Sequence, residues 1–156
     1  MMSRPGFRHG WLCNRIGCLL GEFVNSRQLG YVLNNDSGVV TEEDPDTVRG
    51  PDIAYYSYQR VPKDQPPPEG YPEVAPELIF EILSPNDRWS EVLTRIGELL
   101  TAGVLVVCVV DSRRRHVRVF YPDRPDVTLT EGEELTLPEI LPEWRASVSE
   151  LLGGTN

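Results

Sequence analysis

The hydrophobic pattern predicts two amphipathic helices. Over about 7–24, apolar residues recur every three or four positions, so this segment is expected to bury one helical face. A second helix is expected over about 86–101, with Asn86 or Asp87 as its N-terminal cap. Gly103 follows its expected end, as is typical where a helix C-terminus enters the left-handed conformation.

Alternating or continuous apolar runs predict several β-strands. The strands are expected around Tyr31 and Val39 and over about 53–57, 77–83, 104–110, 116–121 and 127–130. Because these strands flank a crossover helix, the pattern indicates an α/β fold with one mixed central sheet. A length of 156 residues favours a single domain spanning 1–156.

Two polar segments interrupt this pattern. The segment 60–72 is rich in proline, which disfavours the interior of helices and sheets, so it is expected to form a surface loop. The segment 41–47 reads T-E-E-D-P-D-T and predicts an acidic turn. No apolar run approaches the roughly 20 residues that span a bilayer, so a cytoplasmic protein without membrane contact is expected.

The chain is acidic, with 15 Lys and Arg against 24 Asp and Glu and a formal net charge of −9. Nucleic-acid-binding proteins usually present a basic face, so any DNA contact is expected to be weak, local or mediated by a metal. The one basic cluster, 113–116, falls in a predicted hairpin turn. The sequence leaves two interpretations of this cluster: a solvated turn, or a contact to the DNA backbone.

The three cysteines, Cys13, Cys18 and Cys108, are odd in number and lack the CxxC spacing of many zinc sites. The first two fall in the predicted first helix, and the third falls in an apolar strand. All three are interpreted as small residues in or near the core rather than as zinc ligands or disulfide partners.

A carboxylate interrupts the apolar strand P-E-L-I-F-E-I-L-S-P at Glu81. Burying an unpaired carboxylate costs several kcal/mol, so Glu81 requires a partner or a changed protonation state. Asp52 opens another predicted strand, and two converging carboxylates repel unless a cation such as Mg²⁺ joins them. Alternatively, Glu81 pairs with an arginine or faces solvent at a sheet edge.

Two motifs, R49-G-P-D-I-A and P76-E-L-I-F-E-I-L-S-P with a following helix that ends in T-A-G-V, resemble the Uma-two family of restriction endonucleases. That family belongs to the PD-(D/E)XK nuclease superfamily. The resemblance continues through R-P-G-F-R-H-G, the L-G-Y-V region, the V-V-C-V-V-D strand and the leucine-rich tail. It implies a restriction-endonuclease-like fold, in which helices flank a mixed central β-sheet.

The resemblance also implies roles for single residues. Asp52 matches the acidic residue of the PD motif and Glu81 that of the second motif, so both would coordinate Mg²⁺ or Mn²⁺. The carbonyl of Ile82 would be a third ligand. The lysine of the superfamily is expected two residues after Glu81, where this chain has Leu83. In this family the lysine resembles one that has moved to the next helix, at the position of Arg95.

Two further departures concern the charge at position 95 and the start of the chain. Arginine keeps the positive charge but cannot act as a base. A solvated pair of Glu91 and Arg95, four residues apart on one helix, is the alternative. His9 matches a histidine at the start of the family's first helix, either near the scissile phosphate or on the surface. Family members usually carry an N-terminal β-hairpin before it, which is expected to be missing here.

The resemblance implies metal-dependent hydrolysis of DNA phosphodiester bonds, with Asp52 and Glu81 as metal ligands and Arg95 as a source of positive charge. A homodimer would allow both strands to be cut. The alternative function is a catalytically degenerate nuclease fold that serves as a binding or assembly module, which Arg95, the missing hairpin and the acidic charge favour. A Gly-rich phosphate loop or nucleophile elbow, as in many small-molecule enzymes, is absent from the sequence.

Overall fold

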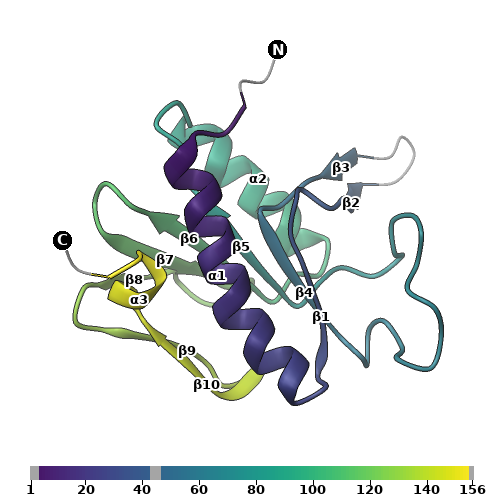
Figure 1. The fold of residues 1–156 in the computed structure, drawn as a ribbon. Helices are drawn as coiled ribbons and strands as arrows, with labels where there is room; N and C mark the ends of the chain where they lie inside the picture. The colour runs from purple at the N-terminus through teal and green to yellow at the C-terminus, as the bar shows by residue number, and fades with distance from the viewer. Residues whose placement is uncertain (1–3, 43–46, 155–156) are drawn as a thin grey trace.

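A long helix crosses one face of a twisted sheet, and a shorter helix covers the other face (Figure 1). The computed structural model describes residues 4–42 and 47–154. In chain order the elements are α1 (Phe7–Ser26), β1 (Gly30–Leu33), β2 (Val39–Glu42), β3 (Thr47–Arg49), β4 (Ile53–Ser57), β5 (Leu78–Ile82), α2 (Trp89–Thr101), β6 (Val106–Asp111), β7 (His116–Phe120), β8 (Val127–Thr130), β9 (Glu134–Leu137), β10 (Leu141–Ser147) and α3 (Val148–Leu151).

The central sheet has six strands in the order β1-β4-β5-β6-β7-β8. Strands β5 and β6 are parallel, and every other neighbouring pair in this sheet is antiparallel. Parallel neighbours require a crossover connection, which α2 provides. The sheet is therefore mixed and flanked by helices, which confirms the α/β fold predicted from the sequence.

Two apolar clusters, one on each face of the sheet, hold the helices in place. Leu12, Ile16 and Leu20 of α1 are fully buried in the first cluster. Ile96 and Leu99 of α2 are buried in the second. Each helix thus buries one stripe of side chains at helical spacing, as its sequence predicts.

The pleat of β5 divides its side chains between these clusters. Phe80 and Ile82 join the α1 cluster, whereas Ile79 joins the α2 cluster. Since successive side chains of a strand point to opposite faces, Glu81 lies on the α2 face with Ile79. The carboxylate in the apolar strand is therefore directed toward α2.

The capping prediction for α2 is wrong at one end and confirmed at the other. Its N-cap is Arg88, and no side chain caps it. The carboxylate of Asp87 instead accepts a hydrogen bond from the backbone N–H of Ser84 at 2.7 Å, because it closes the turn before the helix. Asn86 is therefore not the cap either. Gly103 follows the helix with a φ of 114°, as predicted.

The sequence did not predict every element. Strand β3, the β9–β10 hairpin and the short α3 were not foreseen, and the centre of the predicted acidic turn, 43–46, lies outside the described residues. The proline-rich segment 60–72 forms no helix or strand, as expected. In the described part of the chain, no helix is long and apolar enough to cross a membrane.

The three cysteines occupy different environments. Cys108 is buried in β6, as predicted, and Cys13 is partly buried in α1. Cys18 is exposed, so its prediction as a core residue is wrong. It lies on the outer face of α1, opposite the stripe that contacts the sheet.

Candidate functional site

The register of the sheet brings Asp52 and Glu81 together. Strands β4 and β5 are antiparallel and pair Ile53 with Phe80. Extending this register by one position places Asp52 opposite Glu81. The negative charge of Asp52 also raises the pKa of Glu81, so the two carboxyl groups interact electrostatically.

Asp52 is held by two partners at the start of β4. One of its oxygens, Oδ2, accepts a hydrogen bond of 2.7 Å from the backbone N–H of Ile82. The same oxygen lies 3.2 Å from Nε2 of His9. Burial raises the pKa of Asp52, and the contacts with Ile82 and His9 oppose this effect without cancelling it. The two contacts thus fix the position of the Asp52 side chain, whereas burial disfavours its ionised form.

Glu81 is buried more deeply, with 5% of its surface exposed. Burial raises its pKa to about 8; the positive charge of Arg95 acts against this shift, and the negative charge of Asp52 adds to it. Its Oε1 lies 3.4 Å from Nε of Arg95. Both atoms are buried, and neither has a hydrogen-bond partner among the described residues. The same oxygen of Glu81 is therefore ion-paired with Arg95 but has no hydrogen bond among the described residues.

Arg95 reaches this site from the second turn of α2. It pairs with Glu81, and the described residues contain no ion pair between Glu91 and Arg95. Leu83, where the resemblance would lead one to expect a lysine, is partly buried against the α2 cluster and brings no charge. Arg95 is thus the cation that the fold places beside Glu81, and the arginine pairing left open for Glu81 is also what the structure forms.

The backbone at Ile82 also faces Asp52. The Ile82 N–H donates to Asp52, whereas the N–H of Leu83 donates to the carbonyl of Val110 in β6. Because the N–H and C=O groups of one strand residue point to the same side, the Ile82 carbonyl is directed toward the Asp52 side of β5. This is the direction that a metal-ligating carbonyl requires.

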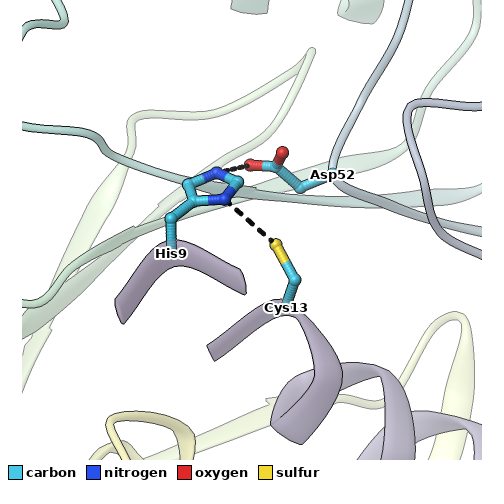
Figure 2. A group of neighbouring side chains, drawn as sticks. All are labelled: His9, Cys13 and Asp52. Carbon is cyan, nitrogen blue, oxygen red and sulfur yellow. Dashed lines mark hydrogen bonds and ion pairs between the residues drawn. The ribbon is translucent and has the colours of Figure 1, made fainter. Parts of the chain in front are cut away.

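His9 lies in the first turn of α1, and its side chain is 14% exposed, so it is not a surface residue. Its ring lies between Asp52 and Cys13, with Nε2 toward the carboxylate and Nδ1 at 3.6 Å from Sγ of Cys13 (Figure 2). Burial and the charge of Asp52 raise the pKa of this thiol to about 12. Sequence reasoning missed Cys13 as a neighbour of His9, although a spacing of four residues puts both on one helix face.

Two clefts meet at His9. The first, of about 490 Å³, is lined by His9 and Ile82 and also by Arg8, Arg113 and Arg114. The second, of about 430 Å³, is lined by nine residues that include His9, Cys13, Asp36 and Asp52. The basic cluster 113–116 is divided: Arg113 and Arg114 line the first cleft, whereas Arg115 does not. Arg115 forms an ion pair with Glu131, with 2.6 Å between Nε and Oε1.

The residues around Asp52 and Glu81 fit a hard divalent cation. Mg²⁺ and Mn²⁺ prefer carboxylate, carbonyl and water oxygens. Two carboxyl groups with raised pKa, a buried Oε1 without a hydrogen bond and a carbonyl directed to the same place form such a donor set. Asp52, Glu81 and the Ile82 carbonyl are the groups that would hold the cation.

The mixed sheet has the crossover helix α2 on one face and α1 on the other. This arrangement defines a restriction-endonuclease-like α/β fold. A solved structure from Anabaena variabilis, described as "a putative nuclease belonging to DUF820", is similar over 97% of this chain and 83% of that chain, with a TM-score of 0.85 and 19% identity. The family model "Uma2: Putative restriction endonuclease" matches residues 1–149. The chain belongs to this Uma2 (Uma-two) family. No curated protein matches it.

Proposed function

We propose that this chain is a metal-dependent endonuclease of the PD-(D/E)XK type that hydrolyses phosphodiester bonds in DNA. The observation that carries the proposal is the buried Glu81 beside Asp52, with an oxygen that lacks a hydrogen bond. A carboxylate in the apolar centre of a sheet is costly for folding and is explained by a functional cation. Membership of a family described as restriction endonucleases supports the same chemistry.

In this reaction a water oxygen forms a bond to phosphorus while the bond from phosphorus to one sugar oxygen breaks, and the proton that the water loses ends, through solvent, on the departing sugar oxygen. Bound Mg²⁺ or Mn²⁺ supplies Lewis acidity and offsets the charge that develops on the phosphate. Asp52 and Glu81 hold the cation, and His9 and the Ile82 N–H orient Asp52. Arg95 adds positive charge but, as a guanidinium, donates hydrogen bonds and does not accept the proton of water.

The first of the two clefts at His9, of about 490 Å³, is the local binding site that this acidic protein offers to a phosphate backbone. Arg8, Arg113 and Arg114 line this cleft, and Ile82 forms part of its wall. Lys and Arg contacts to phosphate supply most of the sequence-independent affinity for DNA. We therefore place DNA binding at one edge of the sheet. The proposal also takes the chain as a single domain spanning 1–156 that acts in the cytoplasm. Cutting both strands would take two copies of the chain or two successive events.

Nicking of supercoiled plasmid tests this function directly. Wild type should nick in Mn²⁺ or Mg²⁺ and stop when a chelator is added, whereas Glu81→Ala and Asp52→Asn should be inactive. Glu22→Ala, an exposed acidic position on α1, is the matched control and should nick like wild type. Metal that binds only the folded chain should also raise its stability by about 2.7 kcal/mol at a hundredfold excess over Kd. An unchanged melting midpoint at millimolar metal would contradict the site.

A second candidate function is a nuclease fold that binds DNA or another chain without cutting. The ion pair between Arg95 and Glu81 favours it, because the arginine already offsets the charge that a metal would neutralise. On this alternative, the folded wild type would bind DNA but would not nick it under any metal. The plasmid assay above, combined with a DNA-binding measurement, separates the two functions.

A further inference from the structure

The contacts of His9 form a cluster with a different chemistry from that of the carboxylate pair. One ligand atom each from His9, Cys13 and Asp52 lies within 4.8 Å of the other two. Imidazole nitrogen and thiolate sulfur are ligands that Zn²⁺ prefers and Mg²⁺ does not. The cluster thus combines soft ligands from α1 with an oxygen ligand that the proposed Mg²⁺ site also uses (Figure 2).

One separation in this cluster, between sulfur and nitrogen, matches that of a zinc site. With Zn–S near 2.3 Å and Zn–N near 2.0–2.1 Å, a tetrahedral angle separates sulfur from nitrogen by about 3.6 Å. Nδ1 of His9 and Sγ of Cys13 are 3.6 Å apart. Asp52 lies on the other side of the ring, 3.2 Å from Nε2 of His9, and one ligand atom from each of the three residues lies within 4.8 Å of the other two. One imidazole binds through one nitrogen, so rotation of these side chains must close the remaining separation.

The surroundings of the cluster favour a cation and leave a path to it. Burial is the main cause of the raised pKa of the Cys13 thiol, and the negative charges of Asp52, Asp36 and Glu81 raise it further. The same charges attract a metal ion. His9, Cys13, Asp36 and Asp52 line one open cleft of about 430 Å³. A metal therefore has access from solvent, and water or Asp36 is available for the fourth position.

We propose that His9, Cys13 and Asp52 bind a thiophilic divalent cation of the zinc type, and that zinc bound there inhibits the nuclease because it withdraws Asp52 from the Mg²⁺ site. When the zinc–sulfur bond forms, the thiol proton is released to solvent. The binding half of this inference stands on the cluster alone. The inhibitory half rests on the proposed function.

Calorimetric titration of Zn²⁺ into the chelator-treated full chain tests binding. Wild type should bind one equivalent, and Cys13→Ser and His9→Gln should each bind at least about tenfold more weakly, since even outer partners of a metal ligand change affinity by 10–100-fold. Cys18→Ser is the matched control, because Cys18 is an exposed thiol on the same helix. With Co²⁺ as a probe, the thiolate-to-cobalt charge-transfer absorption should appear in wild type and Cys18→Ser and be absent in Cys13→Ser. Equal binding by wild type and Cys13→Ser, or a band that depends on Cys18, would overturn the site.

Zinc titrated into the Mn²⁺-dependent nicking assay tests inhibition. Each variant is compared with its own zinc-free rate, and Cys13→Ser should need at least about tenfold more zinc for half inhibition than wild type or Cys18→Ser. If wild type nicks and zinc inhibits all three equally, the inhibitory role is wrong and the proposed function stands. If zinc binds as described but no variant nicks, the zinc site stands and the nuclease proposal fails.

Discussion

Glu81 is a carboxylate in an apolar, buried environment, whereas an isolated carboxylate is most stable in water. It sits between Phe80 and Ile82 in a fully buried strand. Arg95 of α2 forms an ion pair with Oε1 of Glu81 at 3.4 Å, but this oxygen has no hydrogen bond among the described residues. A purely structural ion pair at this depth would be expected to satisfy its oxygens, because burying an incompletely paired charge is unfavourable. The incomplete pairing is the physical reason to assign Glu81 to a functional site.

The raised pKa of Glu81 predicts that stability falls as pH rises. Its pKa is about 8 in the folded chain against an ordinary value of 4.5. The folded state therefore binds more protons than the unfolded state between these values, so the free energy of unfolding should decrease across this window. The contribution is complete below about pH 4.5 and lost above about pH 8. Asp52, whose pKa is also raised, adds to the same trend.

Glu81→Gln should flatten this pH dependence, because the amide stays neutral, and the variant should be at least as stable as wild type near pH 8 in the absence of metal. Urea denaturation at a series of pH values measures it, with Glu22→Gln as an exposed control that keeps the wild-type slope. A loss of more than about 2 kcal/mol in Glu81→Gln would show that ionised Glu81 is a structural partner of Arg95.

Arg95 gives the second residue-level prediction. Arg95→Ala should depress metal-dependent nicking about tenfold, which corresponds to about 1.4 kcal/mol in the barrier. Arg95→Lys should raise it, because an ammonium group is smaller and supplies the charge of the superfamily lysine. Alanine and lysine are both good helix formers, so α2 should tolerate either substitution. Arg124→Ala, at an exposed position outside the clefts that meet at His9, is the control. An Arg95→Ala variant that nicks at the wild-type rate would refute the assignment.

At the scale of elements, local pattern was sufficient where apolar spacing coincides with flanking Gly or Pro residues. The helix that ends at Thr101 and the strand Ile53–Ser57 appear where the sequence predicts them, because their apolar spacing and flanking Gly and Pro residues are local signals. The β9–β10 hairpin was missed because its local signal is interrupted. Its strand β10 carries a bulge between Leu141 and Arg145, which breaks the two-residue period on which a strand prediction depends.

The proposed site was predictable in part. The positions of Asp52 and Glu81 followed from motif resemblance, and the sheet register agrees with their convergence. That His9 and Cys13 meet Asp52 was not foreseen, because helix spacing alone does not say which face of α1 lies next to the start of β4. That Arg8, Arg113 and Arg114 share one cleft could not be read from sequence either, since the first precedes the others by more than a hundred residues. Only the tertiary fold brings such positions together.

The turn between β6 and β7 yields a prediction for an element. Asp111 is buried, and its Oδ1 accepts hydrogen bonds from the backbone N–H groups of Arg113 and Arg114 at 3.1 and 3.0 Å. Asp111→Ala leaves both donors without this acceptor, so the free energy of unfolding should fall by about 1–3 kcal/mol. Asp111→Asn keeps an acceptor and should lose less. Denaturant unfolding measures both, with exposed Asp123→Ala as the control.

Equal losses in the Asn and Ala variants would contradict this explanation. They would indicate that the charge of Asp111, which lies 3.7 Å from both Arg114 and His116, matters more than its hydrogen bonds to the turn. The two variants therefore separate a geometric role in the hairpin from an electrostatic one.

At the scale of the whole molecule, the net charge of −9 and a DNA substrate conflict only if charge is averaged over the surface. Arg8, Arg113 and Arg114 lie at one cleft, beside the proposed metal site, whereas Arg115, Arg118 and Arg124 are paired with acidic side chains elsewhere. Three arginines therefore gather at the edge of the sheet where chemistry is proposed, and one of them, Arg114, also lies 3.7 Å from Asp111. Long-range repulsion by the rest of the protein should keep binding weak and strongly dependent on salt.

This distribution predicts how DNA affinity responds to salt. Each phosphate contact releases counterions, so removing one should reduce the slope of log K against log salt concentration by roughly 1. Arg113→Ala and Arg114→Ala should each show this change in a fluorescence-anisotropy titration of a DNA duplex, measured with chelator to prevent cleavage. Arg124→Ala, whose guanidinium pairs with Glu139, should leave the slope unchanged. If instead all three variants share the wild-type slope, the backbone does not pass through this cleft, and the path of DNA over the protein must lie along another face.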